Sequence, residues 1–222
     1  MIIKTYQVEK INLNINKNFL FYGENEGFKK EIINKKFRDN FKDNTFLYEE
    51  NEILKNEKNF YEEILTQSFF EKEKLIIVSR CTDKMHKIAE ELIEKKIEDL
   101  IIIFNADKLE KKSKLRDLFE KNKNAVCIPF YIDDYKSLSI LASNFFKKIQ
   151  IPISNESINI IIERSAGDRQ NLKNELLKLE NFLTNKKDIN LDQVIKLTNL
   201  SENKNISELV DICLAKNEKK II

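Results

Sequence analysis

Hydrophobic positions along the chain form short unbroken runs that alternate with segments of helical periodicity. Each run has the length of a strand, and continuous rather than alternating apolarity is typical of parallel strands covered on both faces. The runs occupy residues 19–22, 45–48, 74–79, 99–104 and 125–130, and an edge strand could precede them at 2–8. Strand–helix alternation of this kind predicts an α/β fold in which helices flank a parallel sheet.

The chain changes character at Pro152, beyond which helical patterns follow one another without intervening strand-like runs. A long amphipathic helix at 134–149 precedes this point. Three shorter helices follow it, with capping residues available at Ser154, at Asp168 and at Asn190 or Asp192.

These patterns predict two domains and the beginning of a third. We expect an α/β domain over residues 1–150 and a small three-helix lid domain over residues 151–202. A new helical pattern starts at residue 203, close to the end of the chain. Since one amphipathic helix cannot bury its own apolar face, residues 203–222 are expected to begin a helical domain that the chain mostly lacks.

The turn after the first central run has the sequence GENEGFKK at positions 23–30. A phosphate-binding loop has the form G-x-x-x-x-G-K-[ST], in which backbone amides hold phosphate, the lysine neutralises charge and the hydroxyl binds magnesium. Aligned from Gly23, Lys29 fills the lysine position, but Phe28 replaces the second glycine and Lys30 replaces the hydroxyl. The segment, which also contains Gly27, is either a degenerate nucleotide loop that is not expected to bind, or an unrelated strand–turn–helix junction.

Nucleotide hydrolysis also requires an acidic residue at the end of a later strand, where it holds magnesium. The run at 74–79 is followed by Arg80, and the run at 99–104 leads to Asp107, which we interpret as a helix cap or a solvated turn residue. The only histidine, His86, stands among lysines in a helical segment. We therefore expect no catalytic residue, no cofactor and no nucleotide hydrolysis.

Charge and cysteine content narrow the classes of function further. The chain of 222 residues has 39 Lys and Arg against 37 Asp and Glu, a net charge of +2, whereas a freestanding nucleic-acid-binding protein usually has a larger basic excess. Its three cysteines, Cys81, Cys127 and Cys213, lie far apart and match no zinc spacing. We expect no metal site, a cytoplasmic location and no membrane association, because the apolar runs are far shorter than the roughly 20 residues of a membrane span.

The segment 59–70, NFYEEILTQSFF, ends in two adjacent aromatic residues. At about 100° per residue, the positions 60, 61, 64 and 65 form one stripe, whereas Phe69 falls at its margin and Phe70 on the opposite side. Two adjacent aromatic rings cannot both face the core from one helix. Either the pair is exposed and anchors a partner, or it packs under the sheet as the chain turns into the next strand.

The order of these features resembles the delta subunit of the bacterial DNA polymerase III clamp loader. The resemblance covers essentially the whole chain, and it rests on the segments FLFYGEN, QSFF, KLIIV, DLIIIFNADKL and AGDRQNLKNELLKL. It implies an AAA+-like module that neither binds nor hydrolyses ATP, a lid domain and a helical collar domain. The implied partners are the sliding clamp (the beta subunit), the gamma/tau and delta-prime subunits, and primed DNA within the complex.

The resemblance also implies a site for the sliding clamp. The family binds the clamp through a hydrophobic pair at a helix end, and Phe69 and Phe70, preceded by Ser68, match that pair. The family's pattern often begins with a glutamine a few residues earlier, where this chain has Leu65 or Thr66. Gln67 lies nearer the pair, so the clamp-binding residues implied here are Leu65, Gln67, Ser68, Phe69 and Phe70.

Two alternatives remain beside this interpretation. One is another AAA+-like scaffold subunit that makes no clamp contact; the delta-prime type carries zinc-binding cysteines in its first domain, and this chain has no such cluster. The other is a small nucleotide-dependent enzyme with an atypical loop that uses Lys29.

Overall fold

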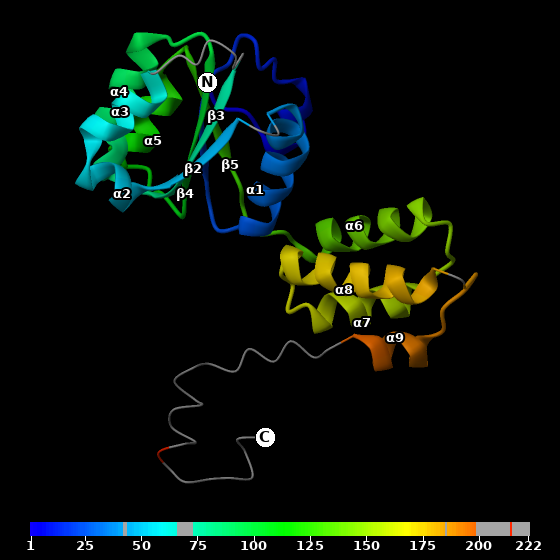
Figure 1. The fold of residues 1–222 in the computed structure, drawn as a ribbon. Helices are drawn as coiled ribbons and strands as arrows, with labels where there is room; N and C mark the ends of the chain where they lie inside the picture. Colours follow the sequence, from blue (N-terminus) through cyan, green and yellow to red (C-terminus); the bar gives the residue numbers. More distant parts are fainter. Residues whose placement is uncertain (42–43, 66–72, 185, 199–213, 215–222) are drawn as a thin grey trace. The chain divides into compact units, whose positions relative to one another are not determined.

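The computed structural model of the protein describes residues 1–41, 44–65, 73–184, 186–198 and 214. The chain divides into two compact units, Met1–Ile132 and Asp133–Ile222 (Figure 1). Within the described residues, none of the helices combines the length and the apolar character that crossing a bilayer requires.

The first unit is built around a five-stranded sheet in which every neighbouring pair is parallel. Its order is β2-β3-β4-β1-β5, so the first strand lies in the interior of the sheet between the fourth and the fifth. The apolar runs of β1, β3, β4 and β5 are mostly buried because both faces of the sheet are covered there, whereas the edge strand β2 is only partly buried. The parallel sheet flanked by helices confirms the predicted α/β class. The strands are β1 (Asn18–Tyr22), β2 (Thr45–Glu49), β3 (Lys74–Cys81), β4 (Leu100–Ala106) and β5 (Ala125–Pro129).

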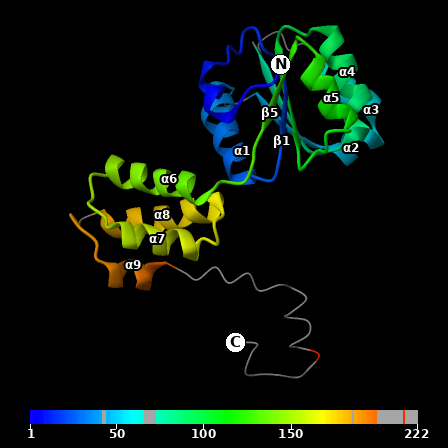
Figure 2. The same cartoon turned by 180° about the vertical axis from the view of Figure 1, so that it is seen from behind.

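Helices cover the two faces of this sheet and create two apolar cores. Figures 1 and 2 show α2 to α5 on one face and α1 on the other. The helices are α1 (Glu26–Ile32), α2 (Glu50–Lys55), α3 (Glu57–Leu65), α4 (His86–Lys95) and α5 (Lys114–Lys121). Shorter turns are the 3-10 helices η1 (Thr5–Lys10), η3 (Arg38–Asn40) and η4 (Asp83–Met85), and the π-helical turn η2 (Ile33–Phe37).

The expected edge strand at residues 2–8 is wrong. Ile2 forms only a single parallel bridge with Cys127 of β5, and the chain then turns into η1, whose Val8 is fully buried. The amide of Lys4 donates to the side chain of Gln7 at 3.2 Å, which favours a helical turn over an extended strand at this point. At the edge of β5, the backbones of Met1 and Ile3 bond to that of Cys127, and no strand forms there among residues 2–8.

The second unit is a bundle of helices that shares one core. Its helices are α6 (Tyr135–Lys148), α7 (Asn155–Arg164), α8 (Arg169–Leu183) and α9 (Leu191–Leu197). The predicted caps are confirmed: Ser154, Asp168 and Asn190 each accept a hydrogen bond from a backbone amide in the first turn of the helix that follows. Residues 203–213 and 215–222, where we expected the start of a further domain, lie outside the described part of the chain.

The division between the units falls after Ile132, earlier than the boundary that we expected at residue 150. The reason is the packing of α6, whose buried Leu138 and Phe146 share a core with Ile161 of α7. An ion pair of 2.6 Å between Arg169, at the start of α8, and Asp133 also ties the residues before α6 to the helical bundle. The unit that we expected to contain three helices therefore includes α6 as well.

Candidate functional site

In α/β folds, ligands bind at the loops that follow the carboxyl ends of the parallel strands. A nucleotide site would therefore lie at the turn after β1. Gly23 begins this turn with φ of +123°. A Cβ atom at this position would lie 2.2 Å from the carbonyl oxygen of Phe130, which follows β5. Only glycine fits there, and its backbone brings the loop into direct contact with the neighbouring segment.

Asn25 holds the loop in a fixed conformation. Its side chain accepts a hydrogen bond of 3.0 Å from the amide of Phe28, which caps α1, and its Nδ2 donates to the carbonyl of Tyr131 at 3.0 Å. Its own amide donates to the carbonyl of Phe130 at 3.2 Å. The amides of Asn25 and Phe28, which a phosphate-binding loop would present to its ligand, are thus bonded within the protein.

Lys29, which sequence reasoning placed at the lysine position of a phosphate loop, is fully buried. Its Nζ donates a hydrogen bond of 2.8 Å to the carbonyl of Ala106, at the end of β4, and forms an ion pair with Glu26 in the first turn of α1. The charge that would neutralise a triphosphate is therefore already paired with a carboxylate of the chain, whose side chain is 52% exposed. Lys29 also joins α1 to the carboxyl end of β4.

Phe28 occupies the position of the second glycine and contributes an aromatic contact to the loop. Its ring packs edge-on against Phe130 with 5.6 Å between the ring centroids. Two carboxylates, Glu24 and Glu26, lie in the same turn, and Glu24 pairs with Lys108 at 3.5 Å. The arrangement presents a filled and partly acidic turn where a nucleotide loop would present bare amides.

The residues at the ends of the neighbouring strands provide few of the ligands that a magnesium site requires. Asp107 is exposed; its Oδ1 accepts a hydrogen bond from the amide of Lys108 at 2.9 Å, and its carbonyl accepts one from the amide of Gly23 at 3.2 Å. This places Asp107 in the turn that we expected. Arg80, the penultimate residue of β3, pairs with Glu49 at 3.3 Å. Among the described residues, Oδ1 of Asn105 is a buried side-chain atom without a hydrogen-bond partner.

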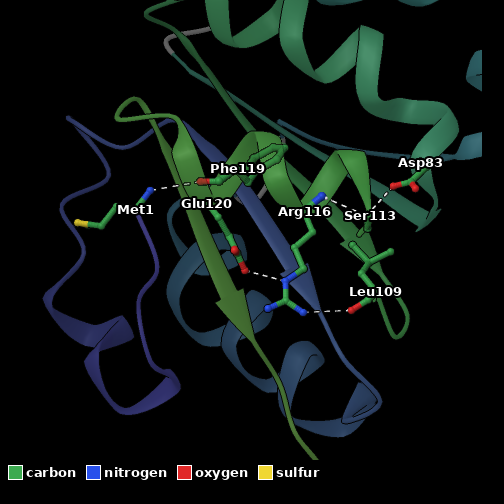
Figure 3. Close-up of polar contacts among 7 residues, drawn as sticks. All are labelled: Met1, Asp83, Leu109, Ser113, Arg116, Phe119 and Glu120. Carbon is green, nitrogen blue, oxygen red and sulfur yellow. Dashed lines mark hydrogen bonds and ion pairs between the residues drawn. The ribbon is translucent and has the colours of Figure 1, made fainter. Parts of the chain in front are cut away.

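Sequence reasoning missed a polar network around α5 that also reaches η4 and β1. Figure 3 shows the contacts of Arg116 with Glu120 and Leu109 and the contact of Ser113 with Asp83. The guanidinium of Arg116 lies 4.8 Å from the ring of Tyr22, donates from Nε to Glu120 at 2.6 Å and reaches the carbonyl of Leu109 at 3.3 Å. The i, i+4 spacing of Arg116 and Glu120 on α5 was the available signal. The network supports the base of the loop, because Tyr22 directly precedes Gly23.

The start of α5 is held by a carboxylate from η4. Oδ1 of Asp83 accepts a hydrogen bond of 2.5 Å from Ser113 Oγ (Figure 3). It also accepts one of 3.1 Å from the amide of Leu115. Burial alone would raise the pKa of Asp83, but these hydrogen bonds outweigh it and hold the pKa below the ordinary value of an aspartate. The carboxylate is thus used to cap a helix.

The described residues provide neither a cluster of metal ligands nor a reactive thiol. They contain no group of three or more His, Cys, Asp or Glu side chains placed to hold a metal ion. Cys81 and Cys127 are free and buried; burial raises the pKa of the Cys127 thiol to about 12 and also raises that of Cys81. Both thiols are therefore protonated at neutral pH, which makes them poor nucleophiles.

The residues implied in clamp binding fall in a part of the chain that the structure does not describe. The helix that leads to them, α3, ends at Leu65, and its Ile64 is buried in the core. The description resumes at Glu73, which pairs with Lys17 at 2.7 Å just before β3. Gln67, Ser68, Phe69, Phe70 and the side chain of Leu65 lie outside the described residues.

Solved structures of bacterial proteins share this fold, and two of them serve for comparison. The Bacillus subtilis DNA clamp loader delta protein matches with a TM-score of 0.58 at 20% identity, over 97% of this chain and 67% of that one. The RuvB Holliday junction branch migration motor of Thermotoga maritima matches with a TM-score of 0.53 at 15% identity, over 96% of this chain and 72% of that one. At these identities the likeness is one of fold.

The sequence itself gives a family. No curated protein matches the chain. The family described as DNA polymerase III, delta subunit, matches residues 19–129, which is half of the chain and includes the turn after β1 and, apart from Asn18, the five strands. This protein therefore belongs to the DNA polymerase III delta subunit family.

Proposed function

We propose that this protein is a non-catalytic clamp loader subunit that binds the sliding clamp and helps to open the ring for loading onto primed DNA during replication. Its proposed partners are the clamp (the beta subunit), the gamma/tau and delta-prime subunits of the loader, and primed DNA within that complex. The cytoplasm is the proposed place of action.

The observation that carries the non-catalytic part of the proposal is the state of Lys29. Its ammonium is buried, bonded to the carbonyl of Ala106 and paired with Glu26. Binding a triphosphate would require this lysine to leave both partners and would require the ring of Phe28 to leave Phe130. Each of these changes costs free energy that a nucleotide loop built for binding does not have to supply.

The clamp-binding part rests on the family and on residues 65–70. Burying Phe69 and Phe70 in a groove of the clamp would contribute about 3 to 6 kcal/mol before the entropic cost of association is subtracted. Binding energy of this size can favour an open ring if the open form binds the pair more tightly than the closed form does.

Two alternatives make different predictions. An AAA+-like scaffold subunit without clamp contact would share this fold and family but would not bind the clamp. A nucleotide-dependent enzyme that uses Lys29 would need the lysine to be accessible, whereas its side chain is fully buried.

A calorimetric titration of the protein against a bacterial sliding clamp tests the proposal. We expect saturable binding by the unmodified protein and at least a tenfold loss of affinity in the double variant Phe69→Ala and Phe70→Ala, since about 1.4 kcal/mol corresponds to a factor of ten. The control is the exposed Tyr6, which is 73% exposed on the first unit and whose replacement by alanine should leave the affinity unchanged.

The thermal unfolding midpoint of the same variants separates a binding role from a structural one. If the pair binds the clamp, its replacement lowers affinity and leaves the midpoint nearly unchanged. A large drop in the midpoint would mean that the pair packs in the core, and undiminished clamp binding would favour the scaffold alternative.

A further inference from the structure

The helix that leads to the proposed clamp-binding residues is short and shallowly embedded. α3 has 9 residues, and its buried side chains include Phe60, 2% exposed, and Ile64, 5% exposed. Helices shorter than about 12 residues are marginal by themselves, so tertiary contacts must hold such a helix in place. The direction in which the chain leaves α3 at Leu65 therefore depends on what fixes the helix.

One flank of α3 is bonded to α4, its neighbour on the same face of the sheet (Figure 1). The phenol of Tyr61 donates a hydrogen bond of 2.8 Å to Oε2 of Glu91, and Nζ of Lys95 lies 4.5 Å from the centroid of the Tyr61 ring. Burial raises the pKa of Tyr61, and the hydrogen bond to Glu91 raises it further, so the phenol remains a donor at neutral pH.

The other flank is bonded to the edge strand β2. The phenol of Tyr48 donates to Oε2 of Glu63 at 2.5 Å. The second oxygen of the same carboxylate, Oε1, accepts a hydrogen bond of 2.7 Å from Nδ2 of Asn59, one turn earlier in α3. Hydrogen bonds from a phenol to a carboxylate are charge-assisted and stronger than neutral ones. Both oxygens of Glu63 are thus engaged.

The hydrogen bonds Tyr61–Glu91 and Tyr48–Glu63 restrain the rotation of α3 about its own axis in opposite directions. At about 100° per residue, Tyr61 and Glu63 lie on opposite sides of the stripe formed by Phe60 and Ile64, each about 80° from its centre. Turning the helix one way lengthens the bond to α4, and turning it the other way lengthens the bond to β2. Two apolar contacts alone would leave this rotation free over a wider range.

We propose that Tyr48, Glu63, Tyr61 and Glu91 are positioning residues that fix the orientation of α3 and thereby present the residues after Leu65 to the sliding clamp. This inference rests on the proposed clamp-binding function. The four residues form two clasps, one between α3 and α4 and one between α3 and β2, and they act through the helix without touching the clamp.

The test uses the full chain and two measurements. The variants are Tyr61→Phe, Glu91→Gln, their combination, and Tyr48→Phe. The matched controls are Tyr6→Phe, which removes an exposed phenol hydroxyl, and Glu90→Gln, which neutralises the exposed neighbour of Glu91. Amide hydrogen exchange of α3 is measured without clamp, and affinity for a bacterial sliding clamp is measured by calorimetry, with the double alanine variant of Phe69 and Phe70 as reference.

We expect exchange in α3 to become faster, and clamp affinity to fall about threefold to tenfold, in Tyr61→Phe, Glu91→Gln and Tyr48→Phe, as the loss of one hydrogen bond implies. Combining Tyr61→Phe with Glu91→Gln should add no further loss, because both changes break the same bond. The controls should match the unmodified protein in both measurements. A merely structural role would accelerate exchange without this loss of affinity.

The outcomes separate the inference from the function on which it rests. Unchanged exchange in α3 would overturn the clasps regardless of clamp binding. Faster exchange with unchanged affinity, in a protein whose Phe69 and Phe70 are required for binding, would overturn the positioning role alone. If the unmodified protein does not bind the clamp, or binds it equally without the phenylalanine pair, the proposed function fails and the positioning role fails with it.

Discussion

Three residues, one at the start of the turn after β1 and two in α1, close this turn, each by a different physical means. Gly23 lets the backbone approach Phe130, Phe28 packs its ring on the same residue, and Lys29 balances its charge internally. The buried hydrogen bond of Lys29 could not be predicted from the sequence, because its acceptor, the carbonyl of Ala106, lies 77 residues away. The local pattern left open whether this segment is a degenerate nucleotide loop or an unrelated strand–turn–helix junction, and the fold shows which side chains fill the turn.

Replacing Gly23 by alanine tests how tightly this turn is built. The new Cβ would meet the carbonyl oxygen of Phe130 at 2.2 Å in a backbone conformation that L-residues disfavour, so the variant should lose about 3 kcal/mol or more. Gly167→Ala is the control: its φ is also positive, at +67°, but no atom lies within 4 Å, and we expect a loss of about 1 kcal/mol. Urea unfolding measures both, and similar losses would contradict the close approach at Gly23.

At the scale of elements, the strands were the most predictable part of the fold. The structure of the first residues and the boundary between the two units were the least predictable. The runs at 74–79 and 99–104 became β3 and β4 because strands buried on both faces must be apolar throughout. Residues 2–8 also contain β-branched and aromatic positions, yet the chain turns at Lys4, whose amide bonds to Gln7, and residues from Thr5 onward are helical. The place of α6 was also missed, because its apolar stripe does not reveal which core it joins.

The attachment of α5 to η4 gives the protein a dependence on pH. The pKa of Asp83 lies below its ordinary value in the folded protein, so its contribution to stability is present above the unfolded pKa and is lost as the pH falls through the folded one. At neutral pH, Asp83→Asn should cost about 0.5 to 1 kcal/mol, a modest value because the side chain is exposed to solvent screening.

Urea midpoints measured from about pH 7 to about pH 3 check this expectation. The difference between the unmodified protein and Asp83→Asn should shrink as the pH falls below about 4, where an ordinary aspartate becomes protonated. Asp39→Asn, at an exposed position in η3, is the control and should follow the unmodified protein throughout. A difference that stays constant with pH would mean that the charge of Asp83 does not matter.

At the scale of the whole molecule, the closed loop predicts a protein that keeps the fold of a nucleotide-binding module without its ligand. Occupation of the loop by Mg–ATP would require Lys29 to leave Ala106 and Glu26, and the amides of Asn25 and Phe28 to leave their present acceptors. We expect no saturable binding in calorimetry up to about 1 mM nucleotide, a limit that corresponds to about 4 kcal/mol of binding free energy. Lys29→Ala should therefore lower the stability and leave the nucleotide titration unchanged, while Lys30→Ala, at the exposed neighbouring position, should affect neither. Micromolar binding that Lys29→Ala abolishes and Lys30→Ala spares would contradict the closed loop and would favour a nucleotide-dependent activity.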